Sequence, residues 1–259
     1  MTASLDTQIS KPSDTAPAVS VVVPVKNEID NVEPLISEIA VALRGREVFE
    51  IIYVDDGSDD GTEVRLVELT EAYPELRVFR HRACCGQSVA ICTGVENASA
   101  PLIATLDGDG QNDPADIPAL IERFRGADDM DQTMVAGWRA KRRDTFIRRL
   151  SSQVANSIRS NLLKDQTPDT GCGLKVFSRA AFMRMPHFNH MHRFLPALMI
   201  RGGGHVVSVE VNHRPRERGT SKYGIWNRLW VGIVDIRGLM WLIRRPVRPE
   251  VKQLKRSGG

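Results

Sequence analysis

Two aspartates one residue apart, in the segment Asp107-Gly-Asp-Gly-Gln111, have the clearest potential for chemistry. They follow a short apolar run and therefore stand at the carboxyl end of a predicted strand, where α/β sheets bind ligands. Their carboxylates can converge only if the chain turns between them, and glycine permits that turn. Hard cations such as Mg²⁺ and Mn²⁺ prefer oxygen ligands and relieve the repulsion between converging carboxylates. The segment therefore predicts a divalent-cation site, with a metal-free Asp/Gly turn as the alternative.

A second acidic pair, Asp55 and Asp56, ends another predicted strand and is followed by a Gly-Ser step. A carboxylate at a strand end can accept hydrogen bonds from a nucleobase or a ribose. The alternative is a helix cap, made by Ser58, Asp59 or Thr62. Both interpretations can hold at once, with an aspartate on the ligand and a neighbour on the helix.

The exit of the first predicted strand, Pro24-Val-Lys-Asn27-Glu28, gives a weaker signal. Asn27 or Glu28 could contact the same nucleotide as the aspartates. Because Asn and Glu before a helix are also ordinary helix-start signals, the pattern leaves both interpretations open.

The elements that would position these residues alternate along the first half of the chain. Apolar, β-branched runs predict strands at 19–24, 50–55, 76–79 and 102–106. Helical periods predict helices at 31–43, 62–73 and 87–98. Four alternations with short connections are typical of a doubly wound parallel sheet, so the predicted fold class is α/β. The second half is less regular, with helices at 146–163 and 179–185, strands at 174–177 and 206–211, and a segment at 192–200 between them.

The composition is that of a globular protein, because 42% of the 259 residues are hydrophobic and the net charge is only +3. No nucleic-acid partner is expected. Basic residues outnumber acidic ones from Arg214 onward, which suits phosphates or an anionic membrane surface, with a solvated tail as the alternative. The four cysteines show no spacing for a zinc site or a disulfide framework and are expected to be small packing residues. The amino terminus lacks the pattern of a signal peptide, which predicts a cytoplasmic location.

A hydrophobic stretch at 225–243 carries Arg228, Asp235 and Arg237, and these charges argue against a membrane-spanning helix. On a helix its apolar residues form one stripe, flanked by tryptophans and followed by arginines. This arrangement is typical of an interfacial helix lying on a bilayer, and a core helix packed on the main domain is the alternative. The stripe consists of Ile225, Leu229, Ile233, Ile236, Met240 and Ile243.

Several motifs occur in a recognisable order. In the first half they are Val-Val-Pro-Val-Lys-Asn-Glu at 22–28, Val-Asp-Asp-Gly-Ser at 54–58, Gly-Gln-Ser at 86–88 and Asp-Gly-Asp-Gly-Gln at 107–111. This set resembles the family 2 glycosyltransferases of the GT-A fold. Three later segments, at 137–144, 169–175 and 218–223, resemble the dolichol-phosphate mannose synthase branch. Bacterial relatives in that branch load undecaprenyl-type phosphates with mannose, glucose, aminoarabinose precursors or uronic acids.

The resemblance covers roughly residues 18–245 and implies a Rossmann-like, mostly parallel sheet flanked by helices, with a C-terminal amphipathic helical segment. It divides the chain into a disordered N-terminal lead at 1–17, a GT-A domain at 18–214, and a basic acceptor loop, interfacial helix and tail at 215–259. One departure stands out. Many relatives carry Arg-Asn just before the Gly-Gln pair, and this chain has Ala83-Cys84-Cys85 there, which puts any contact of that Asn in doubt.

The resemblance also implies roles for matching residues. The metal and diphosphate-sugar site falls on Asp107, Asp109 and Gln111, and implies Mg²⁺ or Mn²⁺ as the cofactor. The base and ribose contacts fall on Asp55 and Asp56, with Pro24, Asn27 and Glu28 at the exit of the first strand. The acid of the acceptor loop is Asp169, and the phosphate-binding cations are Arg139, Arg218 and Lys222. With Asp109, the last four residues form the expected catalytic group.

The predicted function is transfer of a sugar from a nucleotide-diphosphate sugar to a polyprenyl phosphate, with inversion at the anomeric carbon as the resemblance implies. A phosphate monoester is already largely dianionic at neutral pH, so the acceptor needs cations that position it rather than a strong base. The expected place is the cytoplasmic face of the inner membrane, peripherally on an anionic surface. A homo-oligomer or a separate membrane subunit is left open.

Two other functions are kept as alternatives. A family 2 enzyme could act directly on a glycan or on lipid A, without a polyprenyl phosphate. A non-catalytic nucleotide-sugar sensor or membrane scaffold would be expected to lack the paired acids, and Asp107 and Asp109 are both present. The sugar stays open among mannose, glucose and galacturonate, because Lys141, Arg142 and Arg143 could meet a uronic carboxylate or phosphates.

Overall fold

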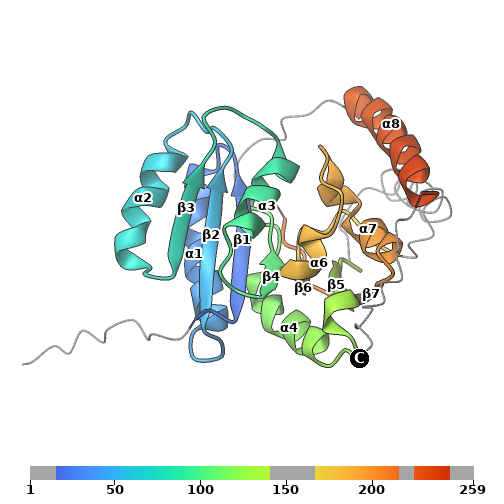
Figure 1. The fold of residues 1–259 in the computed structure, drawn as a ribbon. Helices are drawn as coiled ribbons and strands as arrows, with labels where there is room; N and C mark the ends of the chain where they lie inside the picture. The colour runs from blue at the N-terminus through green and yellow to red at the C-terminus, as the bar shows by residue number, and fades with distance from the viewer. Residues whose placement is uncertain (1–15, 141–166, 216–224, 246–259) are drawn as a thin grey trace, which may run out of the picture.

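The computed structural model describes residues 16–140, 167–215 and 225–245. Its centre is a seven-stranded sheet in the order β3-β2-β1-β4-β6-β5-β7 (Figure 1). The strands are β1 (Val19–Val25), β2 (Phe49–Asp55), β3 (Leu76–Arg80), β4 (Leu102–Thr105), β5 (Thr133–Trp138), β6 (Lys175–Ser178) and β7 (His205–Glu210).

Strand direction follows the predicted α/β pattern with one exception. Strands β1 to β4 are mutually parallel, and β5 pairs with β7 in parallel. Strand β6 runs antiparallel to both of its neighbours, β4 and β5. The first residue of β6 therefore lies at the edge of the sheet where β4 and β5 end, and Lys175 pairs in register with Thr105 and Ala136.

Helices cover both faces of the sheet (Figure 1). On one face, a core cluster joins the sheet to α1 (Ile29–Leu43), α2 (Thr62–Ala72) and α4 (Ile117–Arg125). On the other face, a second cluster joins it to α3 (Gln87–Glu96), α6 (Arg179–Met183), α7 (Leu195–Arg201) and α8 (Ile225–Ile243). Every residue of β1 and β2 is buried, as expected for strands that are covered on both faces. Short 3₁₀ turns complete the described elements: η1 (Pro114–Asp116), η2 (Met130–Gln132) and η3 (Met191–Arg193).

Two elements were not anticipated from the sequence. Helix α4 buries Ile117, Leu120, Ile121 and Phe124 at the spacing of a helix face, so its signal was present. Strand β5 contains little of the β-branched character that predicts strands, and its place between β6 and β7 comes from tertiary packing. The helix predicted at 146–163 lies outside the described residues.

Helix α8 has the bounds predicted for it, but part of its stripe packs inward. Leu239 is 1% exposed, and Ile236, Met240 and Ile243 pack against the second core cluster. The expectation that this stripe faces a bilayer is wrong for Ile236, Met240 and Ile243, where the core-helix alternative holds. The apolar surface that α8 leaves exposed includes Val234 and Trp241, which are 55% and 57% exposed.

Polar contacts hold α8 against the rest of the molecule. His190 Nδ1 lies 3.0 Å from Asp235 Oδ2, and Arg201 Nε donates to the carbonyl of Leu242 at 3.0 Å. Arg201 also donates to the carbonyl of Arg245, beyond the last turn, where helix carbonyls lack partners within the helix. Within the described part of the chain, no helix has both the length and the apolar character needed to cross a bilayer.

Candidate functional site

The paired acids lie in a tight turn directly after β4, at the carboxyl edge of the parallel strands. The backbone N–H of Asp107 donates to Asn112 Oδ1 at 3.3 Å, and that of Gln111 donates to Asp109 Oδ1 at 3.2 Å. Both aspartates are partly exposed. The turn thus brings two carboxylates to one loop, as their spacing predicted.

The electrostatics around Asp107 favour a bound cation. Burial and the neighbouring charge of Asp109 raise the pKa of Asp107, although Lys175, Arg139 and a hydrogen bond from Gln87 act to lower it. Gln87 begins α3, and its Nε2 donates to Asp107 Oδ1 at 2.8 Å. Two neighbouring carboxylates that repel each other supply the oxygen ligands that Mg²⁺ and Mn²⁺ prefer.

The loop before β6 closes against Asp107. A Cβ atom at Gly173 would lie 2.3 Å from the Asp107 carboxylate, so no other residue fits there without displacement. The hydroxyl of Thr105 fixes this loop by donating to the carbonyl of Gly173 at 2.7 Å. Glycine at this point therefore lets the loop backbone pack closely against the Asp107 carboxylate.

Arg139 follows β5 and is held by Asp169. Arg139 Nε and Nη2 donate to the two Asp169 oxygens at 2.7 and 3.0 Å, and the Arg139 backbone N–H adds a bond of 3.3 Å. Both side chains are largely buried, at 11% and 6% exposure. Burial acts to lower the pKa of Arg139, but its hydrogen bonds to Asp169 and the charge of that carboxylate outweigh burial, and the pKa is raised. The pair is a forked, oriented cation beside the acids.

Lys175 is a second cation in this group, and sequence reasoning did not select it. It is 3% exposed, and its Nζ donates to the carbonyl of Cys172. Burial lowers the pKa of Lys175, against the opposing charges of Cys172, Asp107 and Asp169. The available signal was a lone lysine opening an otherwise apolar strand, Lys-Val-Phe, since a buried lysine requires negative partners.

The side chains of the second acidic pair, Asp55 and Asp56, bond to other groups of the protein. Asp55 Oδ1 accepts the backbone N–H and the hydroxyl of Ser58, and Asp55 Oδ2 lies 3.4 Å from Arg80 Nε. Asp56 accepts the backbone N–H groups of Cys85 and Gly86 at 2.7 and 2.8 Å. Burial acts to raise the pKa of Asp56, but hydrogen bonds from His81 and this loop outweigh it, so the pKa is lowered.

Gly57 lets the loop after β3 pack on this corner. Its φ of +70° suits glycine, and a Cβ there would lie 2.9 Å from Ala83 C and Cys84 N. The predicted cap of α2 was wrong in detail. Asp60 accepts the backbone N–H of Thr62 at 2.9 Å and also its hydroxyl, whereas Ser58 and Asp59 bond to other partners.

The exit of β1 is joined to the same corner. The backbone N–H of Asn27, at φ 54°, donates to Ser58 Oγ at 2.8 Å, and Asn27 Nδ2 donates to Asp59 Oδ1 at 2.6 Å. Glu28 accepts from Asn31 Nδ2 at 2.6 Å, one turn into α1. These bonds give Asn27 and Glu28 structural roles, and their predicted nucleotide contact, like that of Pro24 in β1, stays a prediction.

Residues 20–186 match the model of glycosyl transferase family 2. The chain belongs to this family. It is 34% identical over 236 residues to a dodecaprenyl-phosphate galacturonate synthase of Rhizobium johnstonii, covering 89% of this chain and 69% of the relative. It is 33% identical over 211 residues to an undecaprenyl-phosphate 4-deoxy-4-formamido-L-arabinose transferase of Edwardsiella ictaluri, covering 80% of this chain and 63% of the relative. The chain therefore spans about two thirds of the length of these relatives.

Solved structures agree with the GT-A fold expected for family 2. A mannosyltransferase from Pyrobaculum calidifontis in complex with GDP-Man and Mn²⁺ superposes with a TM-score of 0.66 at 21% identity, over 92% of this chain and 69% of that one. A glucosyl-3-phosphoglycerate synthase from Mycobacterium tuberculosis, in complex with Mn²⁺, UDP and its product, gives 0.64 at 16% identity, over 88% and 80%. These likenesses confirm the fold class.

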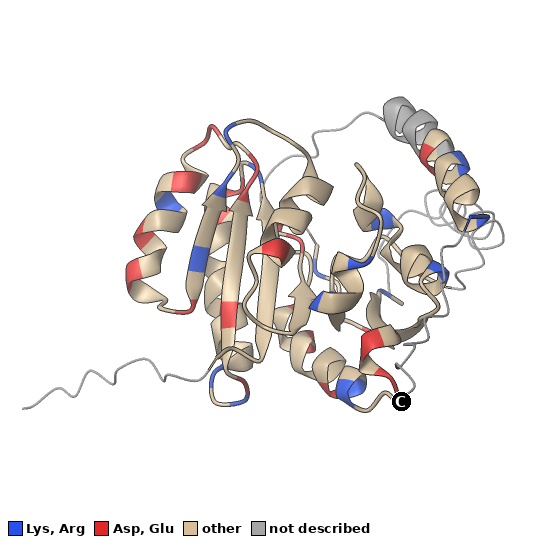
Figure 2. Ribbon diagram, in the orientation of Figure 1, with Lys and Arg blue, Asp and Glu red and all other residues tan. Residues whose placement is uncertain are grey.

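In this family 2 chain, the predicted site residues fall into two neighbouring groups. One group surrounds the ends of β4 and β5 and consists of Asp107, Asp109, Gln111, Arg139 and Asp169. The other joins the ends of β1 and β2 and consists of Pro24, Asn27, Glu28, Asp55 and Asp56. Arg218 and Lys222, together with Lys141 to Arg143, lie outside the described residues. Figure 2 shows charged residues gathered in the loops at the ends of β2 and β3.

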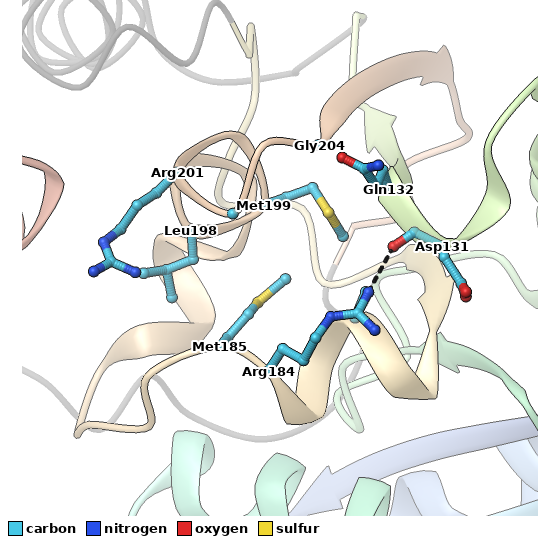
Figure 3. A pocket seen from close by; sticks show the side chains of 10 residues that line it. Asp131, Gln132, Arg184, Met185, Leu198, Met199, Arg201 and Gly204 are labelled. Atoms are coloured by element: carbon cyan, nitrogen blue, oxygen red, sulfur yellow. Dashed lines mark hydrogen bonds between the residues drawn. The ribbon is translucent and has the colours of Figure 1, made fainter. Parts of the chain in front are cut away.

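A cavity elsewhere in the family 2 domain is separate from this site. Figure 3 shows it between η2, α6 and α7, with a volume of about 180 Å³ and with Met185, Leu198 and Met199 in its lining. Arg184 Nη2 donates to the carbonyl of Asp131 at 3.2 Å beside it. Because η2 leads into β5, this cavity lies at the amino end of that strand, opposite the edge that carries the acids.

Proposed function

We propose that this family 2 glycosyltransferase transfers a sugar from a nucleotide-diphosphate sugar to a polyprenyl phosphate. One observation carries the proposal. The two curated relatives are named for different sugars, a galacturonate and a formamido-arabinose, and for the same class of acceptor, a polyprenyl phosphate. The two relatives therefore share the class of acceptor and differ in the sugar. The donor sugar of this chain is accordingly left open.

The acid turn after β4 would hold the donor diphosphate. Asp107 and Asp109 would bind Mg²⁺ or Mn²⁺, with Gln111 beside them, and the ion would neutralise the charge that develops on the departing nucleoside diphosphate. The chain's own contribution is positioning. Gln87 orients Asp107 from the start of α3, and Gly173 lets the loop before β6 pack against the same carboxylate. Asp55 and Asp56, at the adjacent strand ends, would lie near the nucleoside.

The acceptor would be held by fixed cations rather than activated by a base. A lipid phosphate is already largely dianionic near neutral pH, so the chain must orient its oxygen without protonating it. Arg139 suits this task because Asp169 fixes its guanidinium by two side-chain hydrogen bonds. Lys175 is a positioning residue, since its buried charge lies close to Asp107 and Asp169. Arg218 and Lys222 would add further phosphate contacts. Attack from the far side of the anomeric carbon would invert it.

A membrane location follows from the acceptor, because a polyprenyl tail cannot leave the bilayer. The exposed part of α8 suits a membrane surface of anionic lipid on the cytoplasmic side. Trp241 is 57% exposed, and Arg245 Cζ lies 4.7 Å from its ring centroid. Figure 2 shows basic residues on α8 and on the adjacent α7. Aromatic and basic residues together are typical of surfaces that touch lipid head groups.

The test is a transfer assay with purified protein. Undecaprenyl phosphate is incubated with a panel of UDP- and GDP-sugars and a divalent cation, and lipid products are detected by mass. Undecaprenol, which lacks only the phosphate, is the matched acceptor control. We expect a glycosylated product with one donor and with the phosphate acceptor alone. Product formed equally from undecaprenol, or transfer to lipid A or a soluble glycan without any polyprenyl product, would contradict the proposal.

A further inference from the structure

Three side chains of types that bind metals lie close together in the loops after β2 and β3, outside the acid turn. Asp56, His81 and Cys85 each offer one ligand atom, and these atoms all lie within 4.8 Å of one another. Asp56 follows β2, and the other two belong to the loop that joins β3 to α3. The Asp56 and His81 side chains are 6% and 13% exposed, whereas Cys85 is exposed. The set thus combines two firmly placed groups with one that solvent can reach.

Hydrogen bonds fix the orientation of the imidazole. His81 Nδ1 lies 2.8 Å from Asp56 Oδ1, and His81 Nε2 lies 2.9 Å from Thr93 Oγ1 on α3. A metal bound through Nδ1 would displace the bond to Asp56 Oδ1, and the Thr93 hydroxyl would remain as the partner of Nε2, which is the usual arrangement for a metal-binding histidine. The loop is fixed as well, because the backbone N–H of Cys85 donates to Asp56 Oδ1. The three donors are therefore held close together by the fold.

The chemistry of this donor set differs from that of the acid turn. A thiolate, an imidazole and a carboxylate suit Zn²⁺ and related transition metals, whereas Mg²⁺ avoids sulfur. Two anionic donors would balance the charge of a divalent ion. Zinc bond lengths of about 2.0–2.3 Å place tetrahedral ligand atoms roughly 3.3–3.8 Å apart. His81 Nδ1 and Asp56 Oδ1, which lie 2.8 Å apart, must therefore separate slightly, and a donor at the outer limit of 4.8 Å must approach by about 1 Å. The exposed Cys85 side chain can make that movement. The Cys84 thiol, which donates to Asp56 Oδ2 at 3.2 Å, or a water would supply the fourth ligand.

We propose that Asp56, His81 and Cys85 form a binding site for Zn²⁺ or a similar thiophilic divalent cation, separate from the site at Asp107 and Asp109. A bound ion would fasten the loop after β3 to the end of β2, on the corner where Gly57 already lets it pack. It would also occupy the Asp56 carboxylate. This last consequence rests on the proposed function, in which Asp56 lies near the donor nucleoside, and it makes the site inhibitory.

Binding is measured with Co²⁺ as the probe, because thiolate ligation gives a near-ultraviolet charge-transfer band that carboxylates do not give. The reduced full-length protein is titrated without oxygen and with excess Mg²⁺, which fills the acid turn but not a thiolate site. Zn²⁺ is then added to displace the cobalt. The variants are Cys85→Ser and His81→Gln. Cys92→Ser is the matched control, since it removes a thiol on α3 whose pKa burial raises to about 11.

We expect one equivalent of Co²⁺ to give the thiolate band in the wild type and to be displaced by Zn²⁺. The thiolate band should be lost in Cys85→Ser, and the affinity read from it should fall at least tenfold in His81→Gln, both variants being checked for a native circular dichroism spectrum. Band and affinity should stay unchanged in Cys92→Ser. Absence of the band in the wild type, or a band of equal strength in Cys85→Ser, would overturn the site. The Co²⁺ titration contains no sugar substrate, so its result does not depend on the outcome of the transfer assay. Inhibition of wild-type transfer by Zn²⁺ that persists in Cys85→Ser would overturn the inhibitory role.

Discussion

At the scale of single residues, the site depends on charges that the fold places close together and only partly neutralises. Asp107 has a raised pKa because burial and Asp109 outweigh the cations around it. Arg139 and Lys175 stay buried because acids lie beside them. Removing one member of such a group leaves its partners uncompensated, which costs more than the lost contact alone. The variants with the largest effects should therefore be those inside this group.

Asp109→Ala should reduce kcat by at least about a thousandfold, which corresponds to about 4 kcal/mol of barrier. The reason is the loss of one carboxylate of the proposed cation site. The fold should survive, because the side chain is partly exposed and its one hydrogen bond closes only a local turn. Transfer rate and thermal unfolding are measured together. Asp128→Ala, at an exposed position before η2, is the control and should keep full activity. An active Asp109→Ala enzyme would rule the site out.

Cys84→Ser and Cys85→Ser should each keep kcat/KM within about tenfold of the wild type. Cys85 reaches Asp56 through its backbone N–H, which serine retains, and a hydroxyl at position 84 can still donate. The measurement is steady-state transfer in the presence of a chelator selective for Zn²⁺. A fall of more than about 100-fold, or about 2.7 kcal/mol, would give these thiols a role in transfer itself.

At the scale of elements, α8 packs one face against the protein and leaves another face exposed. The residues that form α8 were predictable from the length and hydrophobicity of the stretch. Which face of the helix packs on the rest of the protein was not predictable. The C-terminal half packs Leu239 into the second core cluster, and Arg201 bonds to the carbonyls at its end. Periodicity indicates which residues share a face, and only the position of α7 and the sheet decides which face is covered.

A pair of neighbouring variants separates the two surfaces of α8. Leu239→Ala should lower the free energy of unfolding by about 2–4 kcal/mol, because the side chain is buried. Trp241→Ser should change it by less than about 0.5 kcal/mol, since that side chain is exposed. In flotation with anionic vesicles, Trp241→Ser should bind more weakly than the wild type. If Trp241→Ser and the wild type float equally, Trp241 does not contribute to membrane binding.

The link between α3 and η3 should make stability depend on pH. Burial, with the charges of Arg193, Lys175 and His190, lowers the pKa of His192 to about 3 from an ordinary 6.5. The imidazole is then neutral in the fold, and its Nδ1 lies 2.7 Å from Ser88 Oγ. Between these two values the unfolded chain binds a proton that the folded chain does not, so stability is lost as the pH falls from 6.5 toward 3.

His192→Asn should therefore weaken this acid sensitivity. Between about pH 7 and about pH 4.5, the variant should lose roughly 2 kcal/mol less unfolding free energy than the wild type. Urea unfolding at both pH values measures it. The absolute stability of the variant is not the readout, since the substitution also changes the Ser88 contact. Parallel pH profiles in the two proteins would show that His192 is protonated in the fold.

At the scale of the whole molecule, the sequence predicted the first half better than the second. Strands β1 to β4 and their helices follow from local periodicity, and the acids at the strand ends follow from them. The direction of β6 could not be predicted, because it depends on strands far away along the chain. The same holds for the pairing of Arg139 with Asp169, two predicted site residues that are 30 positions apart, and for Lys175, whose acidic neighbours come together only in the folded chain.

Removal of the cation should affect both catalysis and stability. In excess EDTA, transfer should stop, and UDP should no longer raise the unfolding temperature. With Mn²⁺ and UDP at about 100 times their dissociation constant, the wild type should gain about 2.7 kcal/mol of stability. Differential scanning fluorimetry with and without chelator measures this, and Asp109→Ala should show no gain in either case. Full turnover in excess EDTA would contradict metal dependence.

The position of β6 between β4 and β5 has a consequence for biosynthesis. Strand β5 is complete at residue 138, yet it can join β4 only through β6, which begins at residue 175. A ribosome-bound chain that ends between these points has an open edge on β4, next to acids that do not yet have Lys175 beside them. Such edges invite pairing with other chains. Pulse proteolysis of arrested nascent chains should therefore find protection of β4 only after residue 178 has left the exit tunnel.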